Sequence, residues 1–238
     1  MKTISMTAYN RPDYLKRTLT DLSKNTTGDW HFFISVDPSN KTDEIRKVLD
    51  LDYGFSTVTI EINKQRKDHR RNQHDAIDMA FSAGSKFNLH FDDDLFISPD
   101  ALDLANYYEK TFKDAPLTFG SYGLFNYASD ASKPDRLIKR EKTFTGLGWC
   151  TFKDNWEQLF TTNWFNDNYS KMFGHYGWDW NIAGLYTVNN ISEIFPAFSR
   201  TNHAGREHGT CCNFDFYDKT FPQIVWNKDL IIKDYYYD

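Results

Sequence analysis

Three consecutive carboxylates, Asp92, Asp93 and Asp94, stand between two short apolar runs of the chain. Adjacent negative charges repel one another, so a strand end holds them at a cost unless a positive charge neutralises them. Hard oxygen ligands of this kind prefer Mg²⁺, Mn²⁺ or Ca²⁺ to zinc. If residues 87–91 form a strand, the acids lie at its carboxyl end, where open α/β sheets bind their ligands. The triplet therefore predicts a divalent-cation site, with a solvated acidic turn as the alternative.

Composition limits the classes of protein to consider. The 238 residues are 40% hydrophobic and 26% charged, which is typical of a globular chain with one sizeable α/β domain. A net charge of -5 argues against a protein that grips nucleic acid mainly through its phosphates, although residues 66–71 form a local basic patch. Three cysteines are too few for a disulfide framework. The sequence has no signal-like or membrane-spanning apolar run, so we expect a cytoplasmic protein without a membrane anchor.

Strand-like and helix-like patterns alternate over the first half of the chain. The predicted strands are residues 3–8, 30–36, 56–62 and 87–91, and the predicted helices are 12–23, 42–50, 70–82 and 98–112. This alternation favours a largely parallel sheet between layers of helices. Beyond Pro116 the pattern is less regular, with strands expected at 117–122, 143–152 and 194–198, a helix at 176–186 and a loop from Thr201 onward. We expect a single domain over 1–238, with a donor-nucleotide half (1–115) and an acceptor half (116–238).

The chain lacks the motifs of the commonest nucleotide-binding sites. No Gly-x-Gly-x-x-Gly follows the first strand, and there is no P-loop. The first strand instead runs into residues 8–15 (AYNRPDYL), and the Asp triplet follows later. This combination resembles the GT-A glycosyltransferases. In those enzymes the first strand leads into a sugar-nucleotide pocket, and an Asp-x-Asp motif holds Mn²⁺ through the donor diphosphate.

Five segments extend the resemblance to the β-1,2-N-acetylglucosaminyltransferase I family. They occur in that family's order and are residues 7–12, 91–100, 145–149, 177–180 and 198–201. The resemblance implies a GT-A α/β fold, with a mostly parallel central sheet flanked by helices, a Rossmann-like nucleotide-binding half and an acceptor half. The family's membrane anchor, stem and extra carboxyl-terminal domain have no counterpart in this sequence, which leaves the acceptor and the compartment open.

The resemblance also implies roles for the donor side of the site. Asp94 aligns with the sole protein ligand of a Mn²⁺ or Mg²⁺ ion, whose other ligands are phosphate oxygens and water. Asp92 and Asp93 would then face the nucleoside. Arg11 and Asp37 match uridine-contacting positions, with a surface arginine and a turn-forming aspartate as the alternatives.

Two further segments are expected near the nucleotide. Arg71 and His74, with Asn72 between them, fall where GT-A enzymes meet the base or ribose. Residues 205–209 (GREHG) form a glycine-hinged loop that could close over the donor, with Arg206 or His208 on the diphosphate. The alternative for this segment is an ordinary exposed loop.

Asp179 is the predicted catalytic base. Large apolar rings on both sides of a carboxylate can raise its proton affinity, which suits general-base catalysis on an acceptor hydroxyl. A single in-line displacement would invert the anomeric configuration. Trp178 and Trp180 would line the acceptor cleft. The alternatives are a helix-start aspartate without a catalytic role and Asp167 as a rival base.

The sequence therefore predicts an inverting, metal-dependent glycosyltransferase that uses a UDP-sugar, with UDP-N-acetylglucosamine or UDP-glucose favoured. The acceptor would be a glycan, a hydroxylated small molecule or a nucleic-acid base. One alternative is a viral or phage enzyme that glycosylates a hydroxymethylated pyrimidine in DNA. An alternative of another class is a non-catalytic sugar-nucleotide or glycan-binding module. A nucleotidyltransferase is disfavoured because no glycine-rich loop follows the first strand. The sequence leaves the oligomeric state open.

Overall fold

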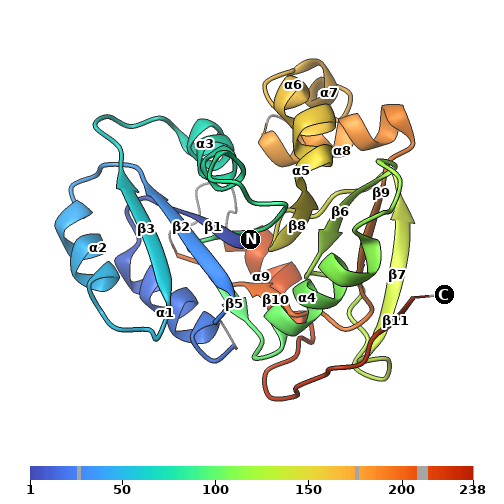
Figure 1. Ribbon diagram of the computed structural model, residues 1–238, viewed down its shortest axis with the longest axis horizontal. Coiled ribbons are helices and arrows are strands. Elements are labelled where there is room, and N and C mark those ends of the chain that lie inside the picture. The colour runs from blue at the N-terminus through green and yellow to red at the C-terminus, as the bar shows by residue number, and fades with distance from the viewer. Residues whose placement is uncertain (26–27, 175–176, 208–213, 238) are drawn as a thin grey trace.

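The computed structural model describes residues 1–25, 28–174, 177–207 and 214–237. A nine-stranded sheet in the order β11-β7-β9-β6-β8-β4-β1-β2-β3 crosses the whole molecule (Figure 1). A second sheet pairs β10 with β5. None of the helices in the described part of the chain is long and apolar enough to cross a bilayer.

The first half is the expected alternation of strands and helices. Its elements are β1 (Lys2–Ala8), α1 (Pro12–Leu22), β2 (Trp30–Val36), α2 (Thr42–Leu49), β3 (Thr57–Ile62), α3 (His69–Ser82) and β4 (Phe87–Asp92). All pairings among these four strands are parallel. Thr7 of β1 is in register with Asp92 of β4, so the carboxyl ends of both strands meet at one edge. The predicted mostly parallel α/β fold is confirmed.

The second half turns the sheet into a mixed one. Its elements are β5 (Leu95–Ile97), α4 (Ala101–Phe112), β6 (Phe119–Gly123), β7 (Arg136–Glu141), β8 (Trp149–Phe152), α5 (Lys153–Asn155), a π-helical turn (Trp156–Phe160), α6 (Thr161–Asn163), α7 (Asn168–Lys171), α8 (Trp178–Asn189), β9 (Ser192–Pro196), β10 (Thr201–His203), α9 (Phe214–Thr220), a 3₁₀ turn (Phe221–Gln223) and β11 (Tyr236–Tyr237). Strand β8 lies antiparallel between β4 and β6 and so joins the two halves.

Two expectations for the second half were wrong. The predicted strand over 143–152 is a strand only from Trp149, because Gly148 has φ +83° and turns the chain just before it. The tail from Thr201, expected as loop, contains β10, α9 and β11. These short strands form because they find partners distant in sequence, β5 and β7, which no local pattern reveals.

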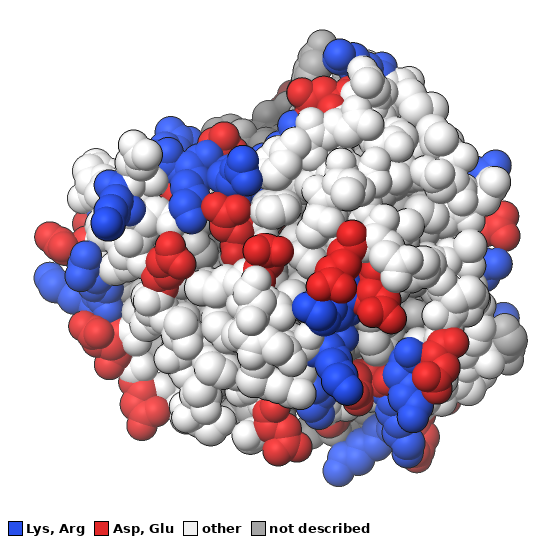
Figure 2. All heavy atoms as spheres, turned by 45° about the horizontal axis from the view of Figure 1, so that its top comes forward, with Lys and Arg blue, Asp and Glu red and all other residues white. Residues whose placement is uncertain are grey.

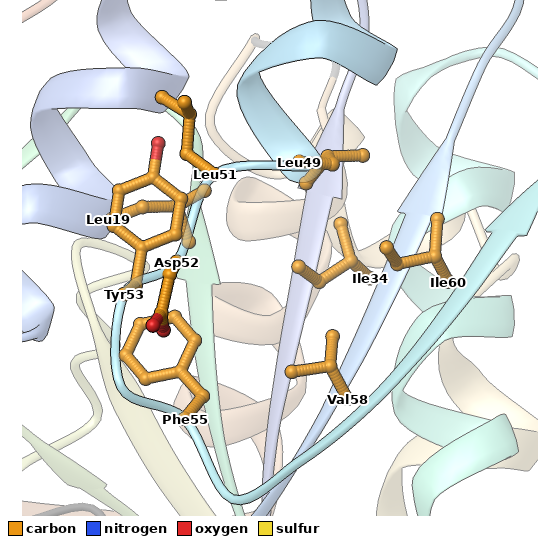
Figure 3. Close-up of a pocket in the computed structure, with 9 residues that line it drawn as sticks. All are labelled: Leu19, Ile34, Leu49, Leu51, Asp52, Tyr53, Phe55, Val58 and Ile60. Carbon is orange, nitrogen blue, oxygen red and sulfur yellow. The ribbon is translucent and has the colours of Figure 1, made fainter.

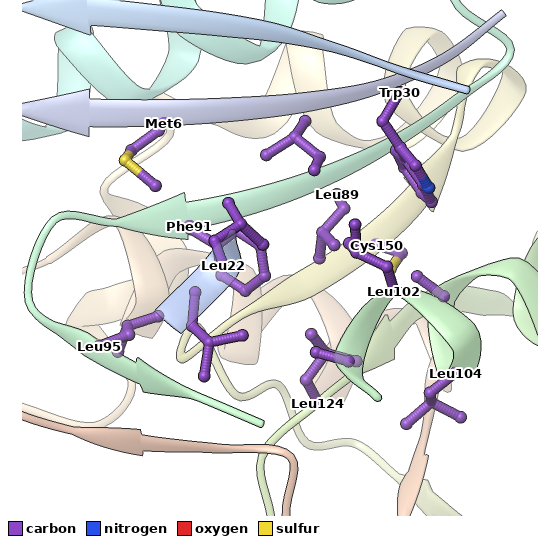
Figure 4. Packing of buried hydrophobic residues seen from close by; sticks show 14 of the residues in the cluster. Met6, Leu22, Trp30, Leu89, Phe91, Leu95, Leu102, Leu104, Leu124 and Cys150 are labelled. Atoms are coloured by element: carbon purple, nitrogen blue, oxygen red, sulfur yellow. The ribbon is translucent and has the colours of Figure 1, made fainter. Parts of the chain in front are cut away.

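Two apolar clusters support the sheet. The larger fills the space between the sheet and helices α1, α2 and α4, and Figure 4 draws part of it, including Met6, Leu89, Phe91 and Leu124. The smaller is strongly aromatic and lies under α3 and α8; its tryptophans are Trp149, Trp156, Trp164 and Trp178. Charged side chains of both signs are interspersed on the face drawn in Figure 2.

A buried ion pair ties the second half together. Asp100 and Arg200 are both 0% exposed, and Arg200 Nε donates to Asp100 Oδ2 at 2.9 Å. The hydroxyl of Tyr235 and the amide of Asn227 also donate to Asp100. The pair therefore anchors the residue before β10 and the carboxyl-terminal segment to the start of α4.

We expect Asp100→Ala to destabilise the protein by about 3–5 kcal/mol, because it leaves the guanidinium of Arg200 buried without its carboxylate. Urea unfolding measures the change. The matched control is Lys24→Ala, which removes an exposed ion pair and should cost at most about 1 kcal/mol. Equal effects of the two substitutions would contradict the assigned role.

Candidate active site

The carboxylate triplet lies at the carboxyl end of β4, as predicted. Asp92 is the last residue of the strand, and Asp93 and Asp94 form the turn into β5. Asp93 is 1% exposed and Asp94 4%. The hydroxyl of Thr18 on α1 lies 2.8 Å from the carbonyl oxygen of Asp93 and holds this turn against the helix. Asp93 and Asp94 are thus buried and are not part of a solvated acidic turn.

Arg11 neutralises two of the three carboxylates. Its Nη2 lies 2.5 Å from Asp93 Oδ1, and its Nη1 lies 2.5 Å from Asp94 Oδ2. Burial opposes the charged form of Arg11, but the neighbouring carboxylates raise its pKa above the usual value. Burial also raises the pKa of Asp93 to about 7, against the effect of Arg11. A positive group is therefore needed here, as the spacing of the acids predicts.

Asp92 is directed toward helix α3. Its Oδ1 accepts from Gln73 Nε2 at 2.6 Å and from Thr7 Oγ1 at 3.2 Å, and His69 Nε2 lies 3.6 Å away. Burial would raise the pKa of Asp92, but the hydrogen bond and charge of His69 outweigh it and hold that pKa below its usual range. Asp92 thus links β4 to α3.

His203 lies beside Asp94. Strand β10 pairs antiparallel with β5 and brings His203 Nε2 to 3.7 Å from Asp94 Oδ2. The other ring nitrogen accepts from Gly205 N at 3.0 Å, which directs Nε2 toward the carboxylate. Gly205 must be glycine, because a Cβ there would clash with Asp94 Oδ2. Sequence reasoning missed His203 because the strand that positions it was expected to be loop.

The donor set at Asp94 suits Mn²⁺ or Mg²⁺ completed by substrate oxygens. A carboxylate and an imidazole are both ligands that Mn²⁺ accepts. The described residues contain no cluster of three or more potential protein ligands. An ion held at Asp94 would therefore need phosphate oxygens and water for the rest of its coordination sphere.

A pocket opens beside the triplet at the ends of β1 and β2. Its lining residues are Thr7, Ala8, Tyr9, Arg11, Asp37, Arg66, His69, Asn72 and Asp93. Asp37 follows β2, is 2% exposed and accepts from Asn63 Nδ2 at 2.9 Å and from Lys67 N at 3.1 Å. The guanidinium of Arg66 lies 4.4 Å from the ring centre of Tyr9. The structure thus brings together three predicted site residues, Arg11, Asp37 and Asp93.

Arg71 and His74 lie outside this pocket lining. Arg71 is exposed and contacts Asp75 and the ring of Phe165. The ring of His74 packs against Trp156, Trp164 and Phe165. The reason is helical periodicity, since residues 71 and 74 occupy a different face of α3 from the residues that line the pocket. That face carries His69 and Asn72 instead.

Asp179 is the second residue of α8. The residue is exposed, yet the protein around it raises the pKa of its carboxyl group by desolvation, and the backbone N–H groups of Trp180 and Asp179 act against this rise. Trp178, the residue before Asp179, lies edge-on to His69, with ring centres 6.5 Å apart, which places the start of α8 next to a residue that lines the pocket. The rival base Asp167 is exposed and pairs with Arg70 at 2.5 Å.

The two tryptophans beside Asp179 differ in their surroundings. Trp178 is 5% exposed and stacks on Trp164, with ring centres 5.2 Å apart, so its ring belongs to the aromatic cluster rather than to an open acceptor surface. Trp180 is 37% exposed and contacts Phe173. Only Trp180 of this pair presents much ring area to solvent.

Arg206 lies just beyond β10 and is engaged with α9. Its Nε and Nη2 donate to the two carboxylate oxygens of Asp218 at 2.6 and 2.8 Å. Glu207 N donates to the hydroxyl of Tyr14 at 3.1 Å, which fixes the segment to α1. His208 lies outside the described residues.

A family model described as glycosyl transferase family 2 matches residues 3–177. The chain belongs to glycosyl transferase family 2. This match confirms the predicted glycosyltransferase character of the domain. The comparison with curated proteins gave no match.

Two solved structures share the fold of this family 2 chain. S. aureus TarS 1-349 in complex with UDP-GlcNAc has a TM-score of 0.58 at 12% identity and covers 92% of this chain and 64% of its own. The mannosyltransferase PcManGT from Pyrobaculum calidifontis, in complex with GDP-Man and Mn²⁺, has a TM-score of 0.55 at 13% identity and covers 87% and 58%. The chain thus spans about three-fifths of the length of these structures. The likeness confirms the predicted GT-A fold; the narrower N-acetylglucosaminyltransferase I resemblance stays a prediction.

A second cavity in this family 2 chain is unrelated to the carboxylates. It has a volume of about 110 Å³ and lies among α1, β2, β3 and the segment after α2 (Figure 3). Its lining is apolar apart from Asp52 and the hydroxyl of Tyr53. No residue predicted for the site lines it, so the triplet pocket is the candidate active site.

Proposed function

We propose that this family 2 enzyme is an inverting, metal-dependent glycosyltransferase that transfers a sugar from a UDP-sugar to an acceptor hydroxyl. UDP-N-acetylglucosamine and UDP-glucose are the favoured donors. The observation that carries the proposal is the pairing of His203 with Asp94, whose neighbour Asp93 lines a pocket together with Asp37. The residue before Asp179, Trp178, lies beside His69 of the same pocket, with ring centres 6.5 Å apart. A glycosyltransferase needs these three functions: diphosphate binding, nucleoside binding and a base.

Asp94 and His203 would hold Mn²⁺ or Mg²⁺, with the donor diphosphate completing the ion's ligands. The bound ion would offset the charge that develops on the leaving diphosphate. Arg11 adds a fixed positive charge at the same carboxylates. The Mn²⁺ in the complex of the mannosyltransferase from P. calidifontis supports a divalent ion in a protein of this fold.

Asp37 would select the base. Its carboxylate is held by Asn63 and Lys67, and a carboxylate oxygen can accept from the N3–H of uracil. Asp93 also lines the pocket and would contact the ribose, whereas Asp92 would act mainly through α3 because Gln73 already donates to it. UDP-GlcNAc bound to TarS supports a uridine donor in this fold.

Asp179 would accept the proton of the attacking hydroxyl. Its raised pKa brings its proton affinity closer to that useful for general-base catalysis. Asp167 is less suited, because its carboxylate is exposed and is engaged by Arg70. Trp180 would contact the acceptor, and Trp178 would support Asp179 by packing.

Arg206 would reach the diphosphate only by leaving Asp218. That ion pair is exposed, and exposed pairs contribute about 0–1 kcal/mol, so donor binding could replace it. Closure of this segment over the donor would limit hydrolysis of the sugar nucleotide. His208 remains a predicted donor contact beside it.

The DNA-base alternative finds less support. The net charge is -5, and the interspersed charges in Figure 2 do not form a continuous basic surface on that face. A purely binding module is disfavoured because Asp94, His203 and Asp179 occur together, since donor binding alone needs no base.

Thermal unfolding with a panel of sugar nucleotides tests the proposal. We expect UDP-sugars with Mn²⁺ to raise the unfolding midpoint, since a ligand at 100 times its Kd stabilises the native state by about 2.7 kcal/mol. UDP release from the stabilising donor then measures turnover. GDP- and TDP-sugars are the controls. Stabilisation by GDP- or TDP-sugars alone would refute a UDP-sugar as the donor. An equal rise of the unfolding midpoint with the UDP-sugar in EDTA would refute the metal dependence.

A further inference from the structure

Glu193 is a buried acid that the proposed reaction does not use. It lies on β9, is 0% exposed, and accepts from Thr145 N at 3.0 Å and Thr145 Oγ1 at 2.5 Å through Oε2. Its Oε1 accepts from Ser121 Oγ on β6 at 3.1 Å. Gly123 leaves room for the carboxylate, because a Cβ there would lie 3.2 Å from Oε1. A buried carboxylate is costly to keep, and here two of its three hydrogen bonds come from one residue of a loop, Thr145.

That loop, residues 145–148, packs against the start of α8. A Cβ on Gly146 would lie 2.7 Å from Trp178 Cη2, so only glycine allows this close approach of the backbone to the indole. The ring of Phe144, just before the loop, also meets Trp178 edge-on, with centres 5.6 Å apart. Trp178 is the residue before Asp179, so the packing of the loop against Trp178 helps to fix the position of the proposed base.

The other side of the same loop contacts the start of β10. Thr201 Oγ1 donates to the carbonyl oxygen of Leu147 at 2.6 Å, and a Cβ on Gly148 would lie 3.1 Å from Thr201 Cγ2. Two residues further along β10, His203 lies beside Asp94. The loop is therefore held between the segment that carries the base and the strand that carries the metal-side histidine.

We propose that Glu193 is a positioning residue that fixes the 145–148 loop and thereby sets the separation between Asp179 and the His203–Asp94 side of the site. Glu193 touches neither donor nor acceptor and acts only through Thr145. The inference rests on the proposed function for the roles of Asp179 and Asp94. It adds Glu193, a residue outside the pocket, as one on which the relative positions of Asp179 and Asp94 depend.

The chemistry of the three hydrogen bonds decides the choice of variants. In Glu193→Gln the amide oxygen can still accept both bonds from Thr145, while its N–H donates to Ser121 Oγ. Glu193→Leu keeps the volume but leaves the N–H of Thr145 buried without its acceptor. Thr145→Val removes the hydroxyl from the other partner at nearly constant shape. The matched control is Asn155→Ala. Asn155 follows β8, at the end of that strand away from the 145–148 loop, and its buried amide donates to the carbonyl oxygen of Phe119.

The kinetic arm measures UDP release from UDP-N-acetylglucosamine with MnCl₂. We expect Glu193→Leu and Thr145→Val each to lower kcat by about 10- to 100-fold, because a misplaced catalytic group costs about this much, with KM for the donor changed less than about twofold. The double variant should lose no more than the stronger single one. Glu193→Gln should restore kcat to within about twofold of the wild type, and Asn155→Ala should leave it unchanged despite its loss of stability.

Hydrogen exchange measured by mass spectrometry gives a second arm that needs no donor. Glu193→Leu and Thr145→Val should speed exchange in peptides that cover 178–189 and 201–203, whereas Asn155→Ala should leave both peptides protected. Exchange that rises equally in all three variants, or kcat that survives both substitutions, overturns the inference. A wild-type protein that releases no UDP counts against the proposed donor alone, and the exchange arm then decides the role of Glu193.

Discussion

Asp94→Ala is expected to lower kcat for sugar transfer by about a thousandfold or more. Asp94 is the carboxylate that can share an ion with a donor diphosphate, and His203 at 3.7 Å cannot hold that ion alone. Loss of several kcal/mol of charge stabilisation in the transition state corresponds to a loss of this size. Arg11 pairs with both Asp93 and Asp94, and the substitution removes only the second of these partners. Asp93 still neutralises the guanidinium, so the fold should persist.

The measurement is UDP release at saturating donor over a series of MnCl₂ concentrations, with circular dichroism to verify folding. The variant should also lose the Mn²⁺-dependent part of donor stabilisation in thermal unfolding. Asp43→Ala is the matched control, because it removes an exposed carboxylate from the first turn of α2. Turnover that persists in Asp94→Ala and in wild-type protein with EDTA would remove the metal from the mechanism.

The fold and the triplet were readable from the sequence because their signals are local. Apolar side chains alternate with Asn88 and His90 over residues 87–91, as in a strand, and the acids follow directly. The end of β4 and the repulsion between its carboxylates are therefore both visible in eight residues. The alternation of strands and helices before Pro116 is similarly a matter of short-range periodicity. The GT-A architecture, by contrast, was implied by the family resemblance that residues 8–15 and the acids carry.

His203 was not readable, because its position depends on the pairing of β10 with β5 across the chain. A three-residue strand has no pattern of its own, and the histidine acquires meaning only beside Asp94. The same holds for Glu193, whose partners Ser121 and Thr145 come from two other segments. Long-range contacts of this kind define the fine geometry of the site.

Of the three α3 residues expected near the nucleotide, only Asn72 lines the pocket, and the face of the helix that it shares with His69 could have been predicted. Ala76 and Ala80 mark the buried face of this helix. Extending that face backward by steps of three and four residues leads to Asn72 and His69, the residues that line the pocket. The apolar side of a helix thus indicates which polar residues at its start point into a neighbouring site.

Asp179→Asn is expected to lower kcat about 100- to 10,000-fold, the range for loss of a general base, while donor affinity stays within about twofold. Asn keeps the shape and can still accept from the backbone N–H groups at the start of α8, so the fold should be preserved. Isothermal titration with UDP and Mn²⁺ measures the binding. Initial rates of transfer measure the loss.

The pH profile separates a base from a residue that only shapes the cleft. Asp179 must be ionised to accept a proton, so kcat/KM should rise with pH through its pKa and level off above it. Since desolvation raises that pKa, the acidic limb should lie at higher pH than for an ordinary aspartate, and Asp179→Asn should lack it. Asp167→Asn is the matched control, because it changes the rival acid, which is exposed and pairs with the half-buried Arg70. If instead Asp167→Asn removes the acidic limb and Asp179→Asn retains it, the base is Asp167, next to α7. The packing of Trp178 would then not serve to position the base.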